Sequence, residues 1–115
     1  MDALEIGLFQ LENLILMKSP FLFFNLAVGD FQISDEKLLS YVQSATVVHK
    51  DRLTDQLQEQ NVDPQFPIVL LCEDGSSSLA VSKELERMGY SNVYVVEGGL
   101  AGLTFEAAGF SSSTK

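Results

Sequence analysis

The sequence predicts an α/β domain built on a mainly parallel sheet of four or five strands, with helices on both faces. Short, continuously apolar runs alternate with segments of helical spacing, as expected when strands are buried on both faces. Turn-forming residues such as Pro20, Gly89 and the Gly98–Gly99 pair separate the segments. With 115 residues, the chain suits one domain. We expect residues 1–110 to form it and residues 111–115 to be a disordered tail.

The first half of the chain predicts two helices and two strands. Apolar residues at mostly helical spacing predict a helix over residues 7–18, which ends before Pro20 because the residue before proline avoids helical angles. Residues 21–26 (FLFFNL) have the composition of a strand buried on both faces, and so do residues 45–49 (ATVVH). Between these strands, Ser34 can cap a second helix.

The second half predicts two further strands and three helices. Asp51 is placed to cap a helix that follows the second strand. Residues 67–71 (PIVLL) form the clearest strand, residues 92–96 (NVYVV) form the next, and a last helix is expected near residues 100–107. The helix between these two strands is expected to bury four apolar side chains, those of Leu79, Val81, Leu85 and Met88.

The composition argues against several classes of function. The chain carries 16 Asp and Glu against 7 Lys and Arg, a net charge of -9, which repels nucleic-acid phosphates and gives no attraction to anionic membranes. The N-terminus (MDALEIG) lacks the basic region of a secretory signal, and polar residues interrupt the most apolar stretch, residues 14–28, so we expect a cytoplasmic protein. The chain has one Cys and one His, too few soft ligands for a metal site, and it has no phosphate-binding glycine fingerprint. We therefore expect neither a bound metal nor an organic cofactor.

The segment around Cys72 carries the candidate chemistry. A buried strand runs directly into this cysteine, and a short loop with Gly75 leads to a helix that Ser76–Ser78 can cap. Backbone N–H groups of the loop and first helical turn can converge on the sulfur, and with the helix dipole they would stabilise a thiolate or a persulfide. An inert buried cysteine would give the same pattern, and Glu73 and Asp74 favour that interpretation because nearby carboxylates oppose thiolate formation.

The segment of residues 67–103 resembles the C-terminal half of rhodanese-like domains, a family that includes sulfurtransferases. That family has an apolar strand, Cys-x-x-Gly-x-Arg-Ser, a helix ending in Gly-Phe or Gly-Tyr, an Asn-Val-Tyr strand and Glu-Gly-Gly. The positions in register are Cys72, Gly75, Ser78, Gly89, Tyr90, Asn92, Val93, Tyr94, Glu97, Gly98 and Gly99. The resemblance implies that Cys72 is the nucleophile, and that an anion cradle comes from the backbone of Glu73, Asp74, Gly75, Ser76, Ser77 and Ser78.

Several positions depart from the family pattern. Ser77 stands where catalytic relatives have an arginine that holds the sulfonate of thiosulfate, and a hydroxyl does not replace a guanidinium fork. Related phosphatases and arsenate reductases carry their arginine one position later, where this chain has Ser78, so phosphoryl and arsenate chemistry is not expected. Asn25 and Ala27 occupy the family's Asp and Arg positions in the first half of the domain. His49 has no visible partner and is expected to be a strand-end residue rather than a base.

Two functions stay open at this point. In the first, Cys72 takes sulfur from a sulfane-sulfur donor, becomes a persulfide and passes the sulfur to an acceptor, each being a small molecule or a protein. Such an enzyme would use thiosulfate weakly because of Ser77. In the second, a rhodanese-like domain that has lost catalysis serves as a binding or regulatory module. Cys72 and Gly75 favour the first function. The second is favoured by Ser77, Asn25, Ala27 and the acidic loop residues Glu73 and Asp74.

Overall fold

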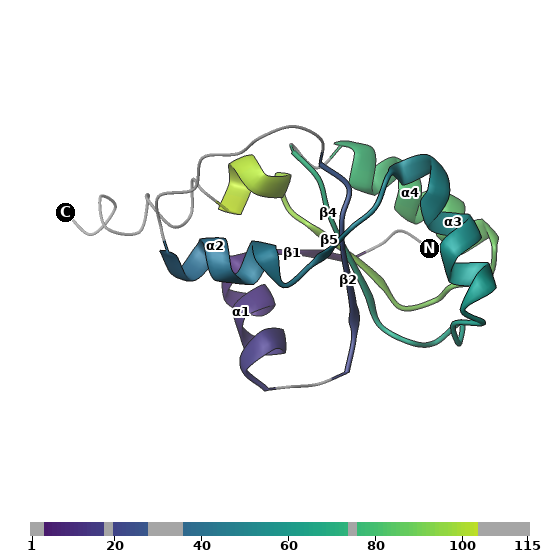
Figure 1. Ribbon diagram of the computed structural model, residues 1–115, viewed down its shortest axis with the longest axis horizontal. Helices are drawn as coiled ribbons and strands as arrows, with labels where there is room; N and C mark the ends of the chain where they lie inside the picture. The colour runs from purple at the N-terminus through teal and green to yellow at the C-terminus, as the bar shows by residue number, and fades with distance from the viewer. Residues whose placement is uncertain (1–3, 18–19, 28–35, 74–75, 104–115) are drawn as a thin grey trace.

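The computed structural model describes residues 4–17, 20–27, 36–73 and 76–103. Within these ranges, five strands form one sheet in the order β1-β5-β4-β2-β3, and every neighbouring pair is parallel (Figure 1). The strands are β1 (Leu4–Ile6), β2 (Leu22–Asn25), β3 (Thr46–Val47), β4 (Ile68–Leu71) and β5 (Val93–Val96). The predicted α/β class with a parallel sheet is therefore confirmed.

Helices cover both faces of this sheet. The helices are α1 (Leu8–Leu16), α2 (Glu36–Gln43), α3 (Lys50–Glu59) and α4 (Ser76–Arg87), and residues 99–103 are also helical. The first two helices and residues 99–103 share one buried core, and α3 and α4 share the other, on the opposite face (Figure 1). None of the helices in the described ranges combines the length and the hydropathy that crossing a bilayer would require.

The side chains of β4 alternate between the two cores because successive residues of a strand point to opposite faces. Val69 and Leu71 belong to the core with α1 and α2, and Ile68 and Leu70 belong to the core with α3 and α4. All four side chains are fully buried, which explains why this run of sequence is continuously apolar. The same alternation places Cys72 on the face that α3 and α4 cover.

Both edge strands differ from the sequence-based expectation. No strand is predicted before residue 21, yet Leu4–Ile6 pairs with β5 as a three-residue edge strand. The predicted strand over residues 45–49 exists as β3, but it has only two residues, and the prediction that it is buried is wrong because both are exposed. Among the described strands, β3 lies at the other edge of the sheet, beside β2. A β-branched run indicates a strand but does not decide whether that strand is central or at an edge.

Two details of the helices also differ. Asp51 does not cap α3, since the cap is His49, whose Nδ1 accepts the Asp51 backbone N–H at 3.2 Å. Leu79 is not buried but 38% exposed, because it lies on the outer side of α4, whereas Val81 and Leu85 are buried as predicted. The predicted cap Ser34, the loop residues Asp74 and Gly75 and the tail at residues 111–115 lie outside the described residues.

A polar contact joins α1 to α2 on the face opposite Cys72. The Tyr41 hydroxyl donates to Glu12 Oε2 at 2.8 Å, and Lys37 Nζ lies 3.0 Å from the same oxygen. The hydrogen bond from Tyr41, and then the one from Lys37, lowers the pKa of Glu12 below its ordinary value of 4.5. Burial, and then the hydrogen bond to Glu12, raises the pKa of Tyr41. The contact therefore couples the packing of these two helices to the ionisation of one carboxylate.

Candidate active site

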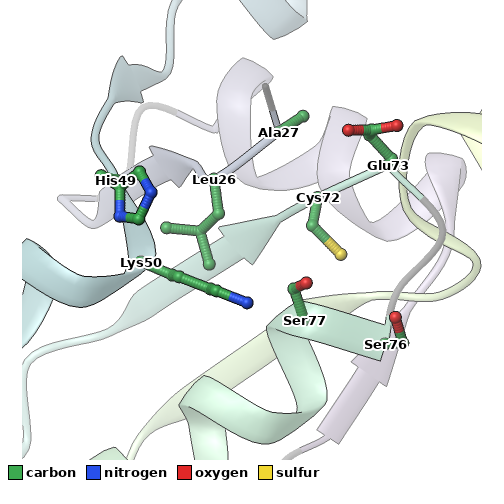
Figure 2. Close-up of a pocket in the computed structure, with 8 residues that line it drawn as sticks. All are labelled: Leu26, Ala27, His49, Lys50, Cys72, Glu73, Ser76 and Ser77. Atoms are coloured by element: carbon green, nitrogen blue, oxygen red, sulfur yellow. The ribbon is translucent and has the colours of Figure 1, made fainter. Parts of the chain in front are cut away.

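Cys72 lies immediately beyond β4, the central strand of the sheet, and lines a cavity of about 270 Å³ (Figure 2). The residue is only 2% exposed, so a reagent that reaches its sulfur has to enter this cavity. Residues from three loops and two helices complete the lining, namely Leu26, Ala27, His49, Lys50, Glu73, Ser76 and Ser77.

The cavity forms at the carboxyl ends of three neighbouring strands. Parallel strands end at the same edge of a sheet, so the residues that follow β2, β3 and β4 converge there. Backbone hydrogen bonds hold the loops together, with the Leu26 N–H donating to the Leu71 carbonyl at 2.6 Å and the Val48 N–H donating to the Asn25 carbonyl at 3.1 Å. Asn25 is itself buried, and its Oδ1 accepts the Ala27 N–H at 3.0 Å. Asn25 thus shapes the turn that places Leu26 and Ala27 at the cavity.

A backbone amide of α4 is aimed at the sulfur. The Ser78 N–H donates to Cys72 Sγ at 3.3 Å. This N–H lies in the first turn of α4, where the amides have no acceptor within the helix and remain available to other groups. The first turn of α3 also contributes to the lining through Lys50. Two helix N-termini, each with a partial positive charge, therefore border the cavity and favour an anion inside it.

A second set of amides fixes the backbone of Cys72 and Glu73. The carbonyl of Cys72 accepts the Leu100 N–H at 2.7 Å, and the carbonyl of Glu73 accepts the Ala101 N–H at 3.0 Å. Both donors belong to the helical segment that starts at Gly99. The chain enters this segment through Gly98 and Gly99, whose φ angles are 71° and 62°, in the left-handed region that favours glycine. The Glu-Gly-Gly motif thus has a structural purpose, which is to hold the Cys72 segment in place.

Four of the six predicted cradle residues lie at the cavity or contact Cys72, and their role as an anion cradle stays a prediction. Glu73, Ser76 and Ser77 line the cavity, and Ser78 supplies the amide that reaches the sulfur. Asp74 and Gly75, the other two predicted cradle residues, lie outside the described residues. The Ser78 side chain is fully buried, and in the part of the chain that the structure describes its Oγ has no hydrogen-bond partner.

Sequence analysis alone missed Lys50 as a residue of this site. His49 was predicted to be a strand-end residue, and it does follow β3, but it also caps α3 and lines the cavity with its side chain 54% exposed. A usable signal exists in the predicted strand over residues 45–49, because the next residue along the chain should reach the same sheet edge as Cys72. Across the described ranges, no three His, Cys, Asp or Glu side chains are grouped closely enough to hold a metal ion.

The fold and the site together define a class of protein, an α/β domain with one cysteine at the carboxyl end of its central parallel strand. The sequence profile of the rhodanese-like domain matches residues 32–105. The chain therefore belongs to the rhodanese-like domain family. This match covers the cavity residues contributed by the loops after β3 and β4 and by the start of α4.

Solved structures share the fold at low sequence identity. A rhodanese-like domain protein from Staphylococcus aureus is 22% identical over 86% of this chain and 89% of its own, with a TM-score of 0.65. A thiosulfate sulfurtransferase from Pseudomonas aeruginosa is 17% identical over 92% of this chain and 19% of its own, with a TM-score of 0.66. An NAD-dependent persulfide reductase from A. fulgidus is 22% identical over 86% of this chain and 15% of its own, with a TM-score of 0.57. At these identities the similarity establishes the fold, which confirms the predicted rhodanese-like architecture.

Proposed function

We propose that the chain is a sulfurtransferase or sulfur carrier in which Cys72 holds the transferred sulfur as a persulfide. The observation that carries this proposal is the position of Sγ, inside a cavity and 3.3 Å from the Ser78 N–H at the start of α4. A hydrogen-bond donor at a helix N-terminus stabilises an anionic sulfur more than a neutral one. The similar domains within a thiosulfate sulfurtransferase and a persulfide reductase support the same chemistry.

The reaction proceeds in two displacements. In the first, the Cys72 thiolate attacks the outer sulfur of a donor R–S–SH, a bond forms between Sγ and that sulfur, and the donor S–S bond breaks. The leaving group RS⁻ takes the electron pair, and Cys72 becomes a hydropersulfide that can lose its proton to solvent. In the second, an acceptor thiolate attacks the outer sulfur and releases the Cys72 thiolate. The protein undergoes no net oxidation or reduction.

Persulfide formation is tested directly by mass spectrometry of the intact protein. Reduced protein is incubated with cysteine persulfide or with thiosulfate, and Cys72→Ser serves as the matched control because the chain contains one cysteine. We expect a gain of about 32 Da, one sulfur atom, on the wild type and none on the variant. The gain should be larger with cysteine persulfide, because Ser77 lines the cavity where a family arginine would hold a sulfonate.

A binding or regulatory module is the second candidate function. Two observations favour it: Cys72 is only 2% exposed, and the Glu73 carboxylate lies at the cavity, where it repels anionic donors. The same experiment separates the two functions. A folded wild-type protein that gains no mass with either donor would contradict sulfur transfer and favour the binding module.

A further inference from the structure

We propose that Lys50 supplies the positive charge that stabilises the anionic outer sulfur at Cys72, and that this single charge, opposed by the Glu73 carboxylate, favours hydropersulfides of thiols as donors over dianionic thiosulfate. This inference rests on the proposed function and names its substrate class. Lys50 is the first residue of α3, and its side chain lines the cavity together with Cys72 and Ser77. Figure 2 shows the side chain extended into the cavity, with its amine directed toward Ser77 and the Cys72 sulfur.

Among the residues that the structure describes, neither packing nor an ion pair explains the position of Lys50. Its side chain is exposed and belongs to neither core. Within the described residues, Lys37 and Arg87 each pair with a carboxylate, whereas Lys50 pairs with none. A cation at the first position of a helix also faces the positive end of the helix dipole, which is unfavourable. An anion in the cavity would offset that cost, because it would interact with the ammonium group and with both helix N-termini.

The charges of the lining indicate which donor fits. Lys50 lies on one side of the cavity and the Glu73 carboxylate on another, beside Ala27 (Figure 2). A single ammonium group can neutralise one negative charge, but as a compact point charge on a flexible stem it lacks the planar fork with which a guanidinium holds a sulfonate. Glu73 adds a repulsion that grows with the charge of the donor. A hydropersulfide, with at most one charge on its sulfurs, therefore fits this lining better than a thiosulfate dianion.

Alkylation kinetics of Cys72 test this role without requiring sulfur transfer. Iodoacetate is anionic and iodoacetamide is neutral, so the ratio of their rate constants reports the electrostatic potential at Sγ, and changes in thiolate population cancel. The chain has one cysteine, so the measurement reports a single site. We expect Lys50→Met to lower the ratio about three- to tenfold, the effect of one charge near a partly solvated site. Lys50→Arg should keep the ratio within about twofold of wild type because it keeps the charge.

Lys83→Met is the matched control, since Lys83 is an exposed lysine of α4 that does not line the cavity, and it should leave the ratio unchanged. A ratio in Lys50→Met equal to that of Lys83→Met overturns the proposed role of Lys50. Charging by cysteine persulfide is measured in parallel on the same proteins. A wild type that cannot be charged by any donor contradicts the proposed function, whatever the alkylation ratio. If the wild type is charged with sulfur but the ratio of the iodoacetate and iodoacetamide rate constants does not change in Lys50→Met, only this inference is overturned and the proposed function stands.

Discussion

Restoring a guanidinium at residue 77 should increase the use of thiosulfate. Ser77 lies in the first turn of α4, is half-buried, and lines the cavity with Cys72. A side chain that starts there needs no rearrangement of the backbone to enter the cavity, and about 270 Å³ leaves room for it. Ser77→Arg would place a planar, permanently charged donor group next to the sulfur and across from Lys50.

The size of the gain follows from the exposure of the site. A hydrogen bond to a charged group contributes about 1.5–3 kcal/mol, which corresponds to one to two decades in affinity. Residue 77 is partly exposed, so solvent screening reduces the contribution toward the lower limit. The introduced cation also lies at the positive end of the α4 dipole, which costs about 0.3–1 kcal/mol of stability. We therefore expect about a tenfold gain in kcat/KM for thiosulfate, equivalent to about 1.4 kcal/mol.

The assay is steady-state formation of thiocyanate from thiosulfate and cyanide. Ser77→Gln is the matched control, because it adds length and hydrogen-bonding capacity without a charge, and it should stay near wild type. Cys72→Ser combined with Ser77→Arg should abolish the activity, because no other thiol is present. A Ser77→Arg protein that uses thiosulfate no better than Ser77→Gln, although cysteine persulfide charges it normally, would contradict the expected effect of the guanidinium group.

Four further predictions concern stability and composition. Ser78→Ala should raise the free energy of unfolding in urea by about 0.5–1 kcal/mol, because it removes a buried hydroxyl that has no partner within the described residues. Gly98→Ala should lower it by about 1–3 kcal/mol, since a β-carbon at φ 71° is strained and would lie 3.0 Å from Gly102 Cα. The folded-state pKa of Glu12 is lowered, so its ionised form stabilises the fold above pH 4.5, and the difference between wild type and Glu12→Gln should vanish as the pH falls through that lowered pKa. Elemental analysis of the purified protein should find no stoichiometric zinc, and one equivalent would contradict the expected absence of a metal.

The central strands of the fold could be predicted from their own sequence, without knowing which strands or helices they contact. Strands β2, β4 and β5 are covered on both faces, so each forms a continuous apolar run that is recognisable without knowing its neighbours. That signal is not reliable for the edge strands, because it is missing from β1 and it wrongly predicts that β3 is buried. β1 has three residues and β3 has two exposed ones, and both exist through pairing with a single neighbour that the sequence does not identify.

The candidate site could be predicted only where it is local in sequence. Cys72 and the residues from Glu73 to Ser78 follow one strand and start one helix, so their proximity follows from chain order. Lys50 reaches the same cavity from a different strand and helix, and its contribution depends on the direction of a long, flexible side chain. No periodicity or spacing encodes that direction, because it is set when three loops meet at the sheet edge.

Because three loops meet at the cavity, the lack of an arginine at residue 77 does not by itself leave the site without a positive charge. The chain is strongly acidic as a whole, with a net charge of -9, and Glu73 makes the loop itself unfavourable for anions. The potential at Cys72, however, is dominated by groups within a few ångströms, because more distant surface charges are screened by solvent and salt. The Ser78 amide contacts the sulfur, and two helix N-termini and Lys50 border the same cavity. A positive charge at the start of α3 can thus stabilise an anionic sulfur at Cys72, which the first turn of α4 also contacts. Ser77 by itself therefore does not distinguish a catalytic domain from one that has lost catalysis.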